Sequence, residues 1–339
     1  MLTPASPWRA AARRGVTLIE LMVGVGLGMV VTAALLLLFA DVSRNAQQVA
    51  RVSAQIEGGR YTAELLRDDL QLAGFYGETS YDGAVFTTPD PCSTDASAAG
   101  FAGAPFGLPT PVRGYSAVEA LACLTSRFRL AGTDALAVRR LAIETVDPTA
   151  LPVGNTQYHV QYSFCSSVLA PVSLVFAKSA ADFSLLNRAC AGANLARAYV
   201  SRIYFVASCN RCGAAGDAVP TLKRLDLVGN QLVETALVEG IESFRLEYGF
   251  DTDGNGSADT YLTAATATGP TSLWENVVAL KLHYIVRSVN ATPNSPTATA
   301  QAFDLGGAGT VNRAADGFNR RAYSTTIRLI NTSGAREAQ

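Results

Sequence analysis

A single carboxylate, that of Glu20, stands near the start of a stretch that is otherwise suited to hydrocarbon. The stretch reads Arg13-Arg14-Gly15-Val16-Thr17-Leu18-Ile19-Glu20-Leu21-Met22 and continues with uncharged, mostly apolar residues to Ala40. An unpaired charge in such surroundings costs at least a few kcal/mol. A bare anchor would do better with leucine at this position, so Glu20 predicts a functional site that needs a partner.

The apolar run is long enough to cross a membrane. Leu21 to Ala40 comprises 20 residues, which at about 1.5 Å per residue span about 30 Å, the thickness of one hydrocarbon core. Arg9, Arg13 and Arg14 all precede the run, so the leader is expected to stay cytoplasmic and the bulk of the chain to face outward. A cleaved secretory signal would be shorter and would end at small residues. Here the run continues into helical sequence, which excludes that alternative.

The same segment resembles the prepilin signal of type IV pilins and type II secretion pseudopilins. That signal has a short basic leader, then glycine, an aromatic or apolar residue, and Thr-Leu-Ile-Glu; Val16 stands where phenylalanine is usual. The resemblance implies that prepilin peptidase cleaves between Gly15 and Val16 and that Val16 is then N-methylated. It also implies that Glu20 pairs with the N-terminal amine of a neighbouring subunit during assembly.

Composition favours a large core and argues against broad binding of nucleic acid. Of the 339 residues, 49% are apolar and 16% are charged. Residues 1–15 carry three arginines and no acid, so their removal changes the formal net charge from −1 to −4. Nucleic-acid binding usually needs a basic face. We therefore expect no nucleic-acid partner.

The helix is predicted to continue beyond the membrane, from about Thr17 to about Leu72. Gly58 and Gly59 weaken it and favour a kink, and Gly74 is a suitable stop. The first half is apolar all round, whereas the second half is amphipathic. Apolar residues recur there at helical spacing: Val42, Ala46, Val49, Ile56, Ala63, Leu66, Leu70 and Ala73.

The remainder of the chain predicts a mainly antiparallel sheet, so the fold class is α+β. Residues 78–118 read as a long loop with short strands, and Val228-Gly229-Asn230-Gln231 reads as a tight hairpin turn. Strands are expected at Asp134–Ala142, Gln157–Ser163, Val172–Ala177, Ala198–Ala207, Thr221–Val228, Gln231–Leu237, Glu242–Gly249, Trp274–Val286 and Tyr323–Ile330.

Several blocks along the chain resemble the PilW minor pilins, and their order strengthens the resemblance. They are Gly59-Arg60-Tyr61, Leu65 to Leu70, Ala73 to Gly77, Gly132 to Arg139, Val238 to Glu242, Glu247-Tyr248-Gly249, Asp251 to Gly256, and Arg320 to Asn331. The resemblance implies a type IV pilin-like fold with a long N-terminal helix packed on the sheet. The expected parts are the leader (1–15), a transmembrane and filament-core helix (16–40), an amphipathic helix (41–76) and a periplasmic β-rich domain (77–339).

The resemblance also implies a function and a location. A protein of this family helps to start pilus assembly at or near the tip of the fibre. Its expected partners are other minor pilins, the major pilin and a tip adhesin, with prepilin peptidase as the processing enzyme. It would first lie in the bacterial inner membrane, crossing it once, and would later be extracellular in the pilus.

One loop predicts a cation site. Asp251, Asp253, Asn255, Ser257 and Asp259 alternate with other residues, two of them glycines, and hard cations such as Ca²⁺ bind several oxygens in this way. The twelfth position is Leu262, where an EF-hand loop needs a bidentate glutamate. A Ca²⁺-binding hairpin loop and a polar turn bonded to its own backbone both stay open.

The six cysteines are expected to form disulfides, because an outward-facing domain lies in an oxidising compartment. The sequence does not choose among the fifteen possible connectivities. We expect neighbours to pair: Cys92 with Cys123, Cys165 with Cys190, and Cys209 with Cys212. The last pair has thioredoxin-like spacing, but without a βαβ setting a structural disulfide is favoured.

No catalytic motif stands in a supporting context, so we do not expect an enzyme. His159 and His283 lie on separate predicted strands without a cluster of metal ligands. One alternative function is that of a type II secretion pseudopilin of the J type, which shares the prepilin signal, helix and sheet. Another is a tip-exposed module that binds a surface or DNA, with residues 78–130 as the place to look.

Overall fold

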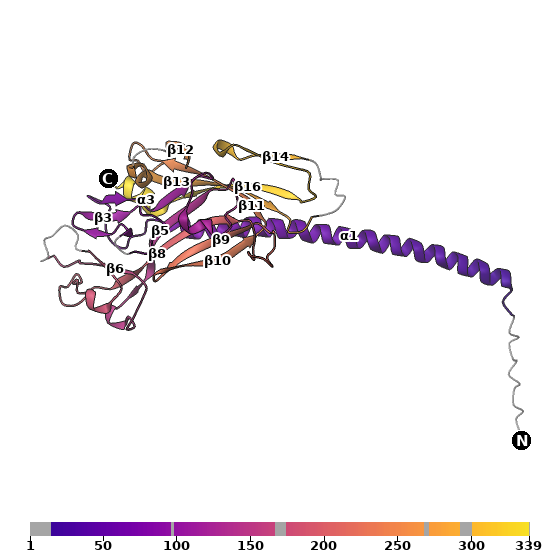
Figure 1. Cartoon of the computed structure of the whole chain (residues 1–339), viewed down its shortest axis with the longest axis horizontal. Coiled ribbons are helices and arrows are strands. Elements are labelled where there is room, and N and C mark those ends of the chain that lie inside the picture. The colour runs from indigo at the N-terminus through magenta and orange to yellow at the C-terminus, as the bar shows by residue number, and fades with distance from the viewer. Residues whose placement is uncertain (1–14, 96–97, 167–173, 268–270, 292–299, 339) are drawn as a thin grey trace, which may run out of the picture. The chain divides into compact units, whose positions relative to one another are not determined.

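The computed structural model describes residues 15–95, 98–166, 174–267, 271–291 and 300–338 (Figure 1). The leader prediction therefore lies, apart from Gly15, outside the described residues, as do the first two positions of the strand expected at Val172–Ala177. The chain forms two compact units, Met1–Ser53 and Ala54–Gln339. The predicted α+β fold class is confirmed: one long helix is followed by sheets that are almost entirely antiparallel.

The helices are α1 (Leu18–Gln71), α2 (Ala122–Thr125) and α3 (Ile330–Glu337), with 3-10 turns η2 (Pro148–Ala150), η3 (Ala180–Asp182), η4 (Thr271–Asn276) and η5 (Gly306–Ala308). The strands are β1 (Val85–Thr87), β2 (Ala102–Gly103), β3 (Phe106–Pro109), β4 (Val112–Tyr115), β5 (Ala135–Val146), β6 (His159–Tyr162), β7 (Leu174–Ala177), β8 (Ala196–Ala207), β9 (Thr221–Val228), β10 (Gln231–Glu239), β11 (Ile241–Phe250), β12 (Thr260–Thr263), β13 (Val277–Arg287), β14 (Gln301–Asp304), β15 (Thr310–Arg313) and β16 (Arg320–Arg328).

Two sheets build the second unit. The larger has the order β10-β9-β8-β5-β4, and β6 joins it through β8 and carries β7. The smaller has the order β12-β11-β13-β16 and is antiparallel throughout. The turn predicted at Val228-Gly229-Asn230-Gln231 joins β9 to β10, with Gln231 opposite Val228. A short sheet of β1, β3 and β2 and the hairpin β14–β15 complete the fold.

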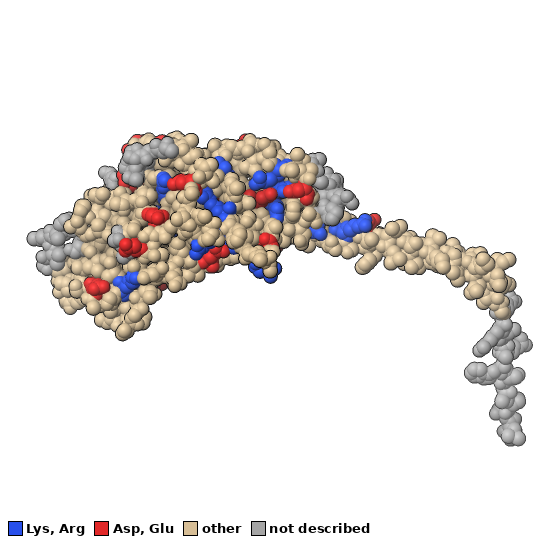
Figure 2. Space-filling view, in the orientation of Figure 1, with Lys and Arg blue, Asp and Glu red and all other residues tan. Residues whose placement is uncertain are grey.

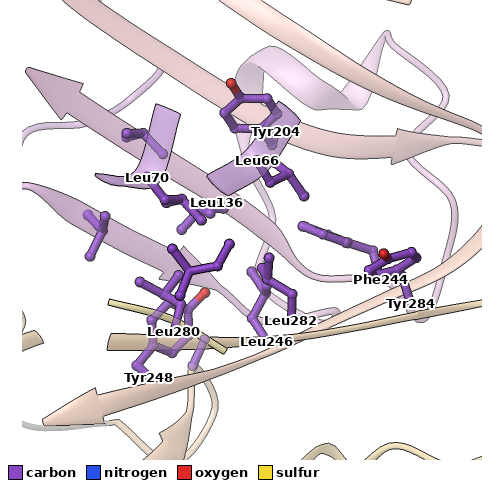
Figure 3. Close-up of a cluster of buried hydrophobic side chains, with 14 of the residues drawn as sticks. Leu66, Leu70, Leu136, Tyr204, Phe244, Leu246, Tyr248, Leu280, Leu282 and Tyr284 are labelled. Carbon is purple, nitrogen blue, oxygen red and sulfur yellow. The ribbon is translucent and has the colours of Figure 1, made fainter. Parts of the chain in front are cut away.

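The C-terminal half of α1 fills the space between these two sheets. Leu66 and Leu70 are fully buried and belong to one cluster with residues of both sheets, as Figure 3 shows. From the larger sheet the cluster takes Leu136 and Tyr204, and from the smaller sheet it takes side chains that include Phe244, Leu246, Tyr248, Leu280, Leu282 and Tyr284. Leu66 and Leu70 follow the predicted apolar spacing, and Ala63 is partly buried against the same cluster. Val42, Ala46 and Val49 were expected on the same face but are exposed, because the buried part of α1 begins only at Gln55.

The helix α1 continues through Gly58 and Gly59 without a break. Gly59 allows it to pack closely on the smaller sheet. The Tyr284 hydroxyl donates to the Gly59 carbonyl oxygen at 2.7 Å, and the Tyr323 ring stacks on Tyr284 with centroids 5.4 Å apart. A Cβ on Gly59 would lie 2.3 Å from Cζ of Tyr323. The glycine therefore lets the helix backbone approach the tyrosines of the smaller sheet.

This packing predicts opposite effects at the two glycines. Gly59→Ala forces its methyl group against the Tyr323 ring and should lower the free energy of unfolding by about 1–3 kcal/mol. Gly58→Ala is the matched control, since its Cβ would meet only Val238 Cγ1, at 3.7 Å. Alanine there should raise the free energy of unfolding by about 0.5–1 kcal/mol. Urea titration of both variants measures the difference, and equal effects would contradict it.

Two expectations about the sheet domain need correction. Trp274 does not begin a strand: it lies in η4, buried against Tyr248 with ring centroids 4.9 Å apart. Ile330 does not end a strand either, because β16 stops at Arg328 and Ile330 begins the helix α3. Residues 112–115 lie in the segment predicted as a long loop with short strands, and they form the short strand β4, which pairs with β5 in the larger sheet.

Candidate assembly site

Thr17 directly precedes the long helix and caps its first turn. The backbone N–H of Glu20 donates to Thr17 Oγ1 at 3.3 Å, and the N–H of Leu21 donates to the Thr17 carbonyl oxygen at 3.0 Å. A threonine followed three residues later by glutamate is the capping-box pattern, which satisfies free N–H groups at a helix start. Gly15, Val16 and Thr17 therefore precede the helix, and Glu20 lies in its first turn.

The Glu20 side chain is exposed and accepts no hydrogen bond from any described residue. The helix around it is long and apolar enough to span a membrane, with a mean hydropathy of 2.5 over its best window. On the face that Figure 2 shows, the other side chains of this part of α1 are uncharged. Within the described chain, Glu20 thus combines a carboxylate, an apolar setting and the lack of an internal partner.

Farther along α1, Asp69 fastens the helix to the larger sheet. Its carboxylate is buried and receives Arg140 Nε at 3.0 Å and Arg202 Nη1 at 2.6 Å. The Tyr204 hydroxyl donates to its second oxygen at 2.8 Å. Three donors from β5 and β8 therefore compensate one buried charge on the helix.

Tyr204 is suited to this role because it stays protonated. Burial raises the pKa of Tyr204, and the negative charge of Asp69 raises it further. Arg202 also donates to Asp226 at 3.0 Å, and Asp226 binds Arg224 at 2.8 Å. The network alternates acids and bases, so no described member is left as a lone buried charge.

The candidate cation loop lies between β11 and β12, and the structure brings its acids together. Carboxylate oxygens of Asp251, Asp253 and Asp259 lie within 4.8 Å of one another. Asp253 accepts from the N–H of Asn255 at 3.1 Å, and Asn255 Oδ1 accepts from the N–H of Ser257 at 2.8 Å. These bonds are those of a polar turn closed on its own backbone.

The most buried of these acids, Asp251, already has a positively charged partner within the protein. Arg336 of α3 donates through Nε to Asp251 at 2.6 Å, and the N–H groups of Gly254 and Gly256 donate to the same carboxylate. A Cβ on Gly256 would lie 2.3 Å from Glu337 Cγ, so the loop packs directly on α3. The donors that fit Ca²⁺ best are therefore the exposed Asp253 and Asp259, and Ca²⁺ binding stays a prediction.

This contact predicts an acid-sensitive part of the stability. Burial raises the pKa of Asp251, but the hydrogen bonds from Arg336, Gly256 and Gly254 outweigh burial and lower the pKa from 3.8 to about 2. A carboxyl whose pKa is lowered on folding stabilises the fold above its unfolded pKa. That contribution is lost as the pH falls through its folded pKa.

Between about pH 4 and pH 2, the free energy of unfolding of the unchanged chain should therefore fall by about 1–2 kcal/mol more than that of Asp251→Asn. Asp253→Asn is the control, because it removes an exposed charge from the same loop. Urea titrations at several pH values measure the slopes. Parallel slopes for Asp251→Asn and the unchanged chain would count against the role of this ion pair.

The structure joins the cysteines as three disulfides: Cys92–Cys123, Cys165–Cys190 and Cys209–Cys212. These are the pairs that were expected from neighbour pairing. The first bridges the loop after β1 to α2, and the second ties the segment after β6 to the loop before β8. The third lies within the connection from β8 to β9.

The two histidines occupy ordinary strand positions. His159 Nδ1 lies 3.0 Å from the Gln157 carbonyl oxygen, and His283 Nε2 lies 2.9 Å from Glu247 Oε1. The N–H of Gly307 donates to the same glutamate oxygen at 2.9 Å, which fastens the β14–β15 hairpin to the smaller sheet. His283 and Glu247 lie on the neighbouring strands β13 and β11, where His283 is opposite Arg245, two residues from Glu247, and sequence spacing alone did not join them.

Comparison with known proteins supports the resemblance found in the sequence. Residues 203–331 match the model of the family described as Type IV Pilus-assembly protein W, PilW. The PilW-like blocks from Val238 to Asn331 lie inside this match, which confirms the predicted relationship. Among solved structures, the chain is similar to a type IV-like pilin from Thermus thermophilus at 13% identity and a TM-score of 0.24, covering 59% of this chain and 80% of that one. No curated protein matches.

Proposed function

We propose that this chain is a minor prepilin that helps to initiate type IV pilus assembly and lies at or near the tip of the fibre. One observation carries the proposal. A domain that matches a pilus-assembly family is built on a helix that continues unbroken into an apolar segment whose only charge is Glu20. Such a protein acts by assembly and not by catalysis.

The proposed mechanism is electrostatic and noncovalent after processing. Prepilin peptidase cleaves after Gly15, and the new amine at Val16 is methylated and keeps its positive charge. This amine meets Glu20 of a neighbouring subunit, which removes the cost of an unpaired carboxylate in hydrocarbon. The apolar part of α1 then passes from lipid to the packed axis of the filament.

The remaining elements supply location and partners. The basic leader holds the N-terminus in the cytoplasm, so the sheet domain lies in the periplasm before assembly and outside the cell afterwards. We propose that this domain contacts other minor pilins, the major pilin and a tip adhesin. Ca²⁺ at the Asp253–Asp259 edge of its acidic loop is part of the proposal as an additional ligand.

Processing gives the direct test. Mass spectrometry of the chain from piliated cells should find a mature N-terminus at methylated Val16, and Gly15→Val should leave the leader attached and stop piliation. Gly24→Ala is the control, since it keeps the cleavage site and changes another glycine of the same segment. Normal fibres built from a chain that retains its leader would overturn the proposal.

A strain that lacks the chain distinguishes the proposed function from the nearest alternative. If the chain acts as a pseudopilin of the J type, its loss should block protein secretion and leave piliation unchanged. Loss of fibres with normal secretion supports the minor-pilin function.

A further inference from the structure

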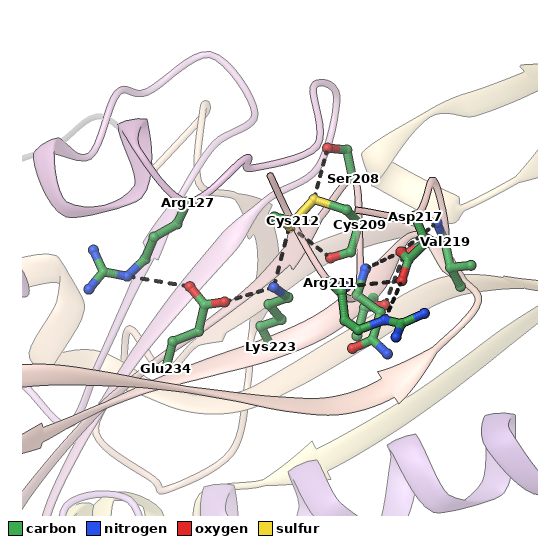
Figure 4. The surroundings of a disulfide bond; sticks show 11 residues. Arg127, Ser208, Cys209, Arg211, Cys212, Asp217, Val219, Lys223 and Glu234 are labelled. Carbon is green, nitrogen blue, oxygen red and sulfur yellow. Dashed lines mark hydrogen bonds and ion pairs between the residues drawn. A yellow bond between two sulfur atoms is a disulfide. The ribbon is translucent and has the colours of Figure 1, made fainter. Parts of the chain in front are cut away.

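The disulfide Cys209–Cys212 lies beside a buried lysine that the proposed function does not use. Lys223 Nζ of β9 is 3.5 Å from Cys212 Sγ, and the Lys223 side chain is only 4% exposed (Figure 4). A cation next to a cysteine sulfur stabilises the thiolate more than the thiol. The contact therefore favours the reduced, ionised form of Cys212.

The cluster of Lys223, Glu234 and Arg127 carries one positive charge in excess, while Glu239 faces the same loop and accepts from Asn210 Nδ2 at 2.5 Å. Lys223 binds Glu234 Oε1 at 2.7 Å, and Arg127 Nε lies 3.4 Å from Glu234 Oε2. Two cations thus share one carboxylate. The nearby charged pair Arg211–Asp217, at 3.6 Å, is balanced in itself. A thiolate at Cys212 would complete the neutralisation of the Arg127, Lys223 and Glu234 cluster.

Hydrogen bonds to Asp217 also hold the loop around the pair, in addition to the disulfide. Asp217 accepts from the N–H groups of Asn210, Arg211 and Val219 at 2.8, 3.1 and 3.2 Å. The disulfide closes a sequence separation of only 3, against 31 and 25 for the other two. A short crosslink restricts the unfolded chain least, so opening this one costs the fold least.

The two cysteine residues differ in their exposure to solvent. Cys209 is buried at 6% exposure, whereas Cys212 is half-buried and is followed by the exposed residues 213–216. An incoming thiolate must reach a sulfur in line with the bond that it breaks. Cys212 is the more exposed residue of the two, so we assign the attack to its sulfur.

We propose that Cys209–Cys212 is a thiol–disulfide exchange site that takes an external dithiol, such as the active-site dithiol of a thiol oxidoreductase. A thiolate of the dithiol attacks Cys212 Sγ, and the Cys212–Cys209 bond breaks. Cys209 leaves as a thiolate and takes a proton from water.

The second thiolate of the dithiol then attacks the dithiol sulfur that is bonded to Cys212 in the mixed disulfide. The Cys212 thiolate leaves and stays ionised beside Lys223. The protein disulfide gains two electrons, the dithiol is oxidised to its disulfide, and one proton is left in solution. The reverse sequence reoxidises the pair.

Graded reduction of the full chain in detergent micelles tests the proposal. Samples equilibrated in dithiothreitol redox buffers are alkylated, and mass spectrometry counts the label at each cysteine. We expect Cys209 and Cys212 to open at a reductant ratio at least about tenfold lower than the other four cysteines. Opening of either other pair first would overturn the proposal.

Two variants test the effect of Lys223 on the Cys212 thiolate, and they should change the alkylation rate of Cys212 in opposite directions. After reduction, Lys223→Met should slow alkylation of Cys212 near neutral pH by about fivefold or more, because the thiolate loses its cation. Glu234→Gln should speed it, because Lys223 is left to the sulfur alone. A variant that merely unfolded would expose the thiol and could not reproduce both directions.

Lys281→Met is the matched control, since Lys281 lies over the Tyr261 ring on the smaller sheet. It should leave the alkylation rate of Cys212 unchanged. Equal rates and pH profiles in the unchanged chain, Lys223→Met and Glu234→Gln would show a purely structural disulfide. Loss or retention of piliation does not bear on this measurement.

Discussion

Asp69→Ala should lower the free energy of unfolding by about 3–5 kcal/mol, the loss typical when one partner of a buried ion pair is removed. Arg140 and Arg202 both donate to the Asp69 carboxylate, and the Tyr204 hydroxyl donates to it as well. Alanine would leave these groups without their acceptor beneath α1. Asp69→Asn should cost less, because the amide oxygen can still accept a hydrogen bond.

Asp68→Ala is the matched control for this prediction. Asp68 precedes Asp69 on the same helix but is exposed, so its removal should change the free energy of unfolding by about 0.5 kcal/mol or less. Urea titration followed by tryptophan fluorescence suits the mature chain, because Trp274 is the only tryptophan after residue 15. Similar losses for the two variants would refute the anchoring role of Asp69.

Glu20→Ala should remove the chain from sheared pili while leaving it in the membrane. Alanine is easily accommodated in hydrocarbon, so insertion and cleavage should persist, whereas the attraction to a neighbouring amine is lost. We expect the amount in the pilus fraction to fall by about tenfold or more, which corresponds to only about 1.4 kcal/mol of lost interaction. Immunoblots of sheared fibres and of membranes measure both pools.

Two further variants define what Glu20 contributes. Glu20→Gln keeps the shape and removes the charge, so it should behave like alanine if the pairing is ionic. Asp41→Ala removes another acid of α1, one that lies 3.6 Å from Arg44 near the helix surface, and should leave the pilus fraction unchanged. Undiminished incorporation of Glu20→Ala would sink the pairing hypothesis.

Regular periodicity explains where sequence prediction agrees with the structure. The helix expected from about Thr17 to about Leu72 is observed at Leu18–Gln71, and the strand expected at Thr221–Val228 has those bounds. In both cases a sustained apolar pattern ends at glycine-containing turns. The sites Gly15, Val16 and Glu20 also come from a local pattern, and their proposed contact joins different subunits.

The elements that escaped prediction depend on contacts between distant residues. Asp69 lies 71 residues from Arg140 and 133 residues from Arg202, so nothing in the local sequence joins them. The helix α3 was not predicted, and its first residue, Ile330, was expected to end the strand Tyr323–Ile330. Its conformation is held by tertiary contacts such as the bond from Arg336 to Asp251.

Because Leu66 and Leu70 are shared by both sheets, the C-terminal half of α1 is as much a part of the globular domain as any strand. A truncation designed for solubility has to start at or before Ala54, well upstream of the first strand. One that starts at residue 77, the predicted start of the β-rich domain, would leave apolar faces of both sheets exposed to water and should precipitate.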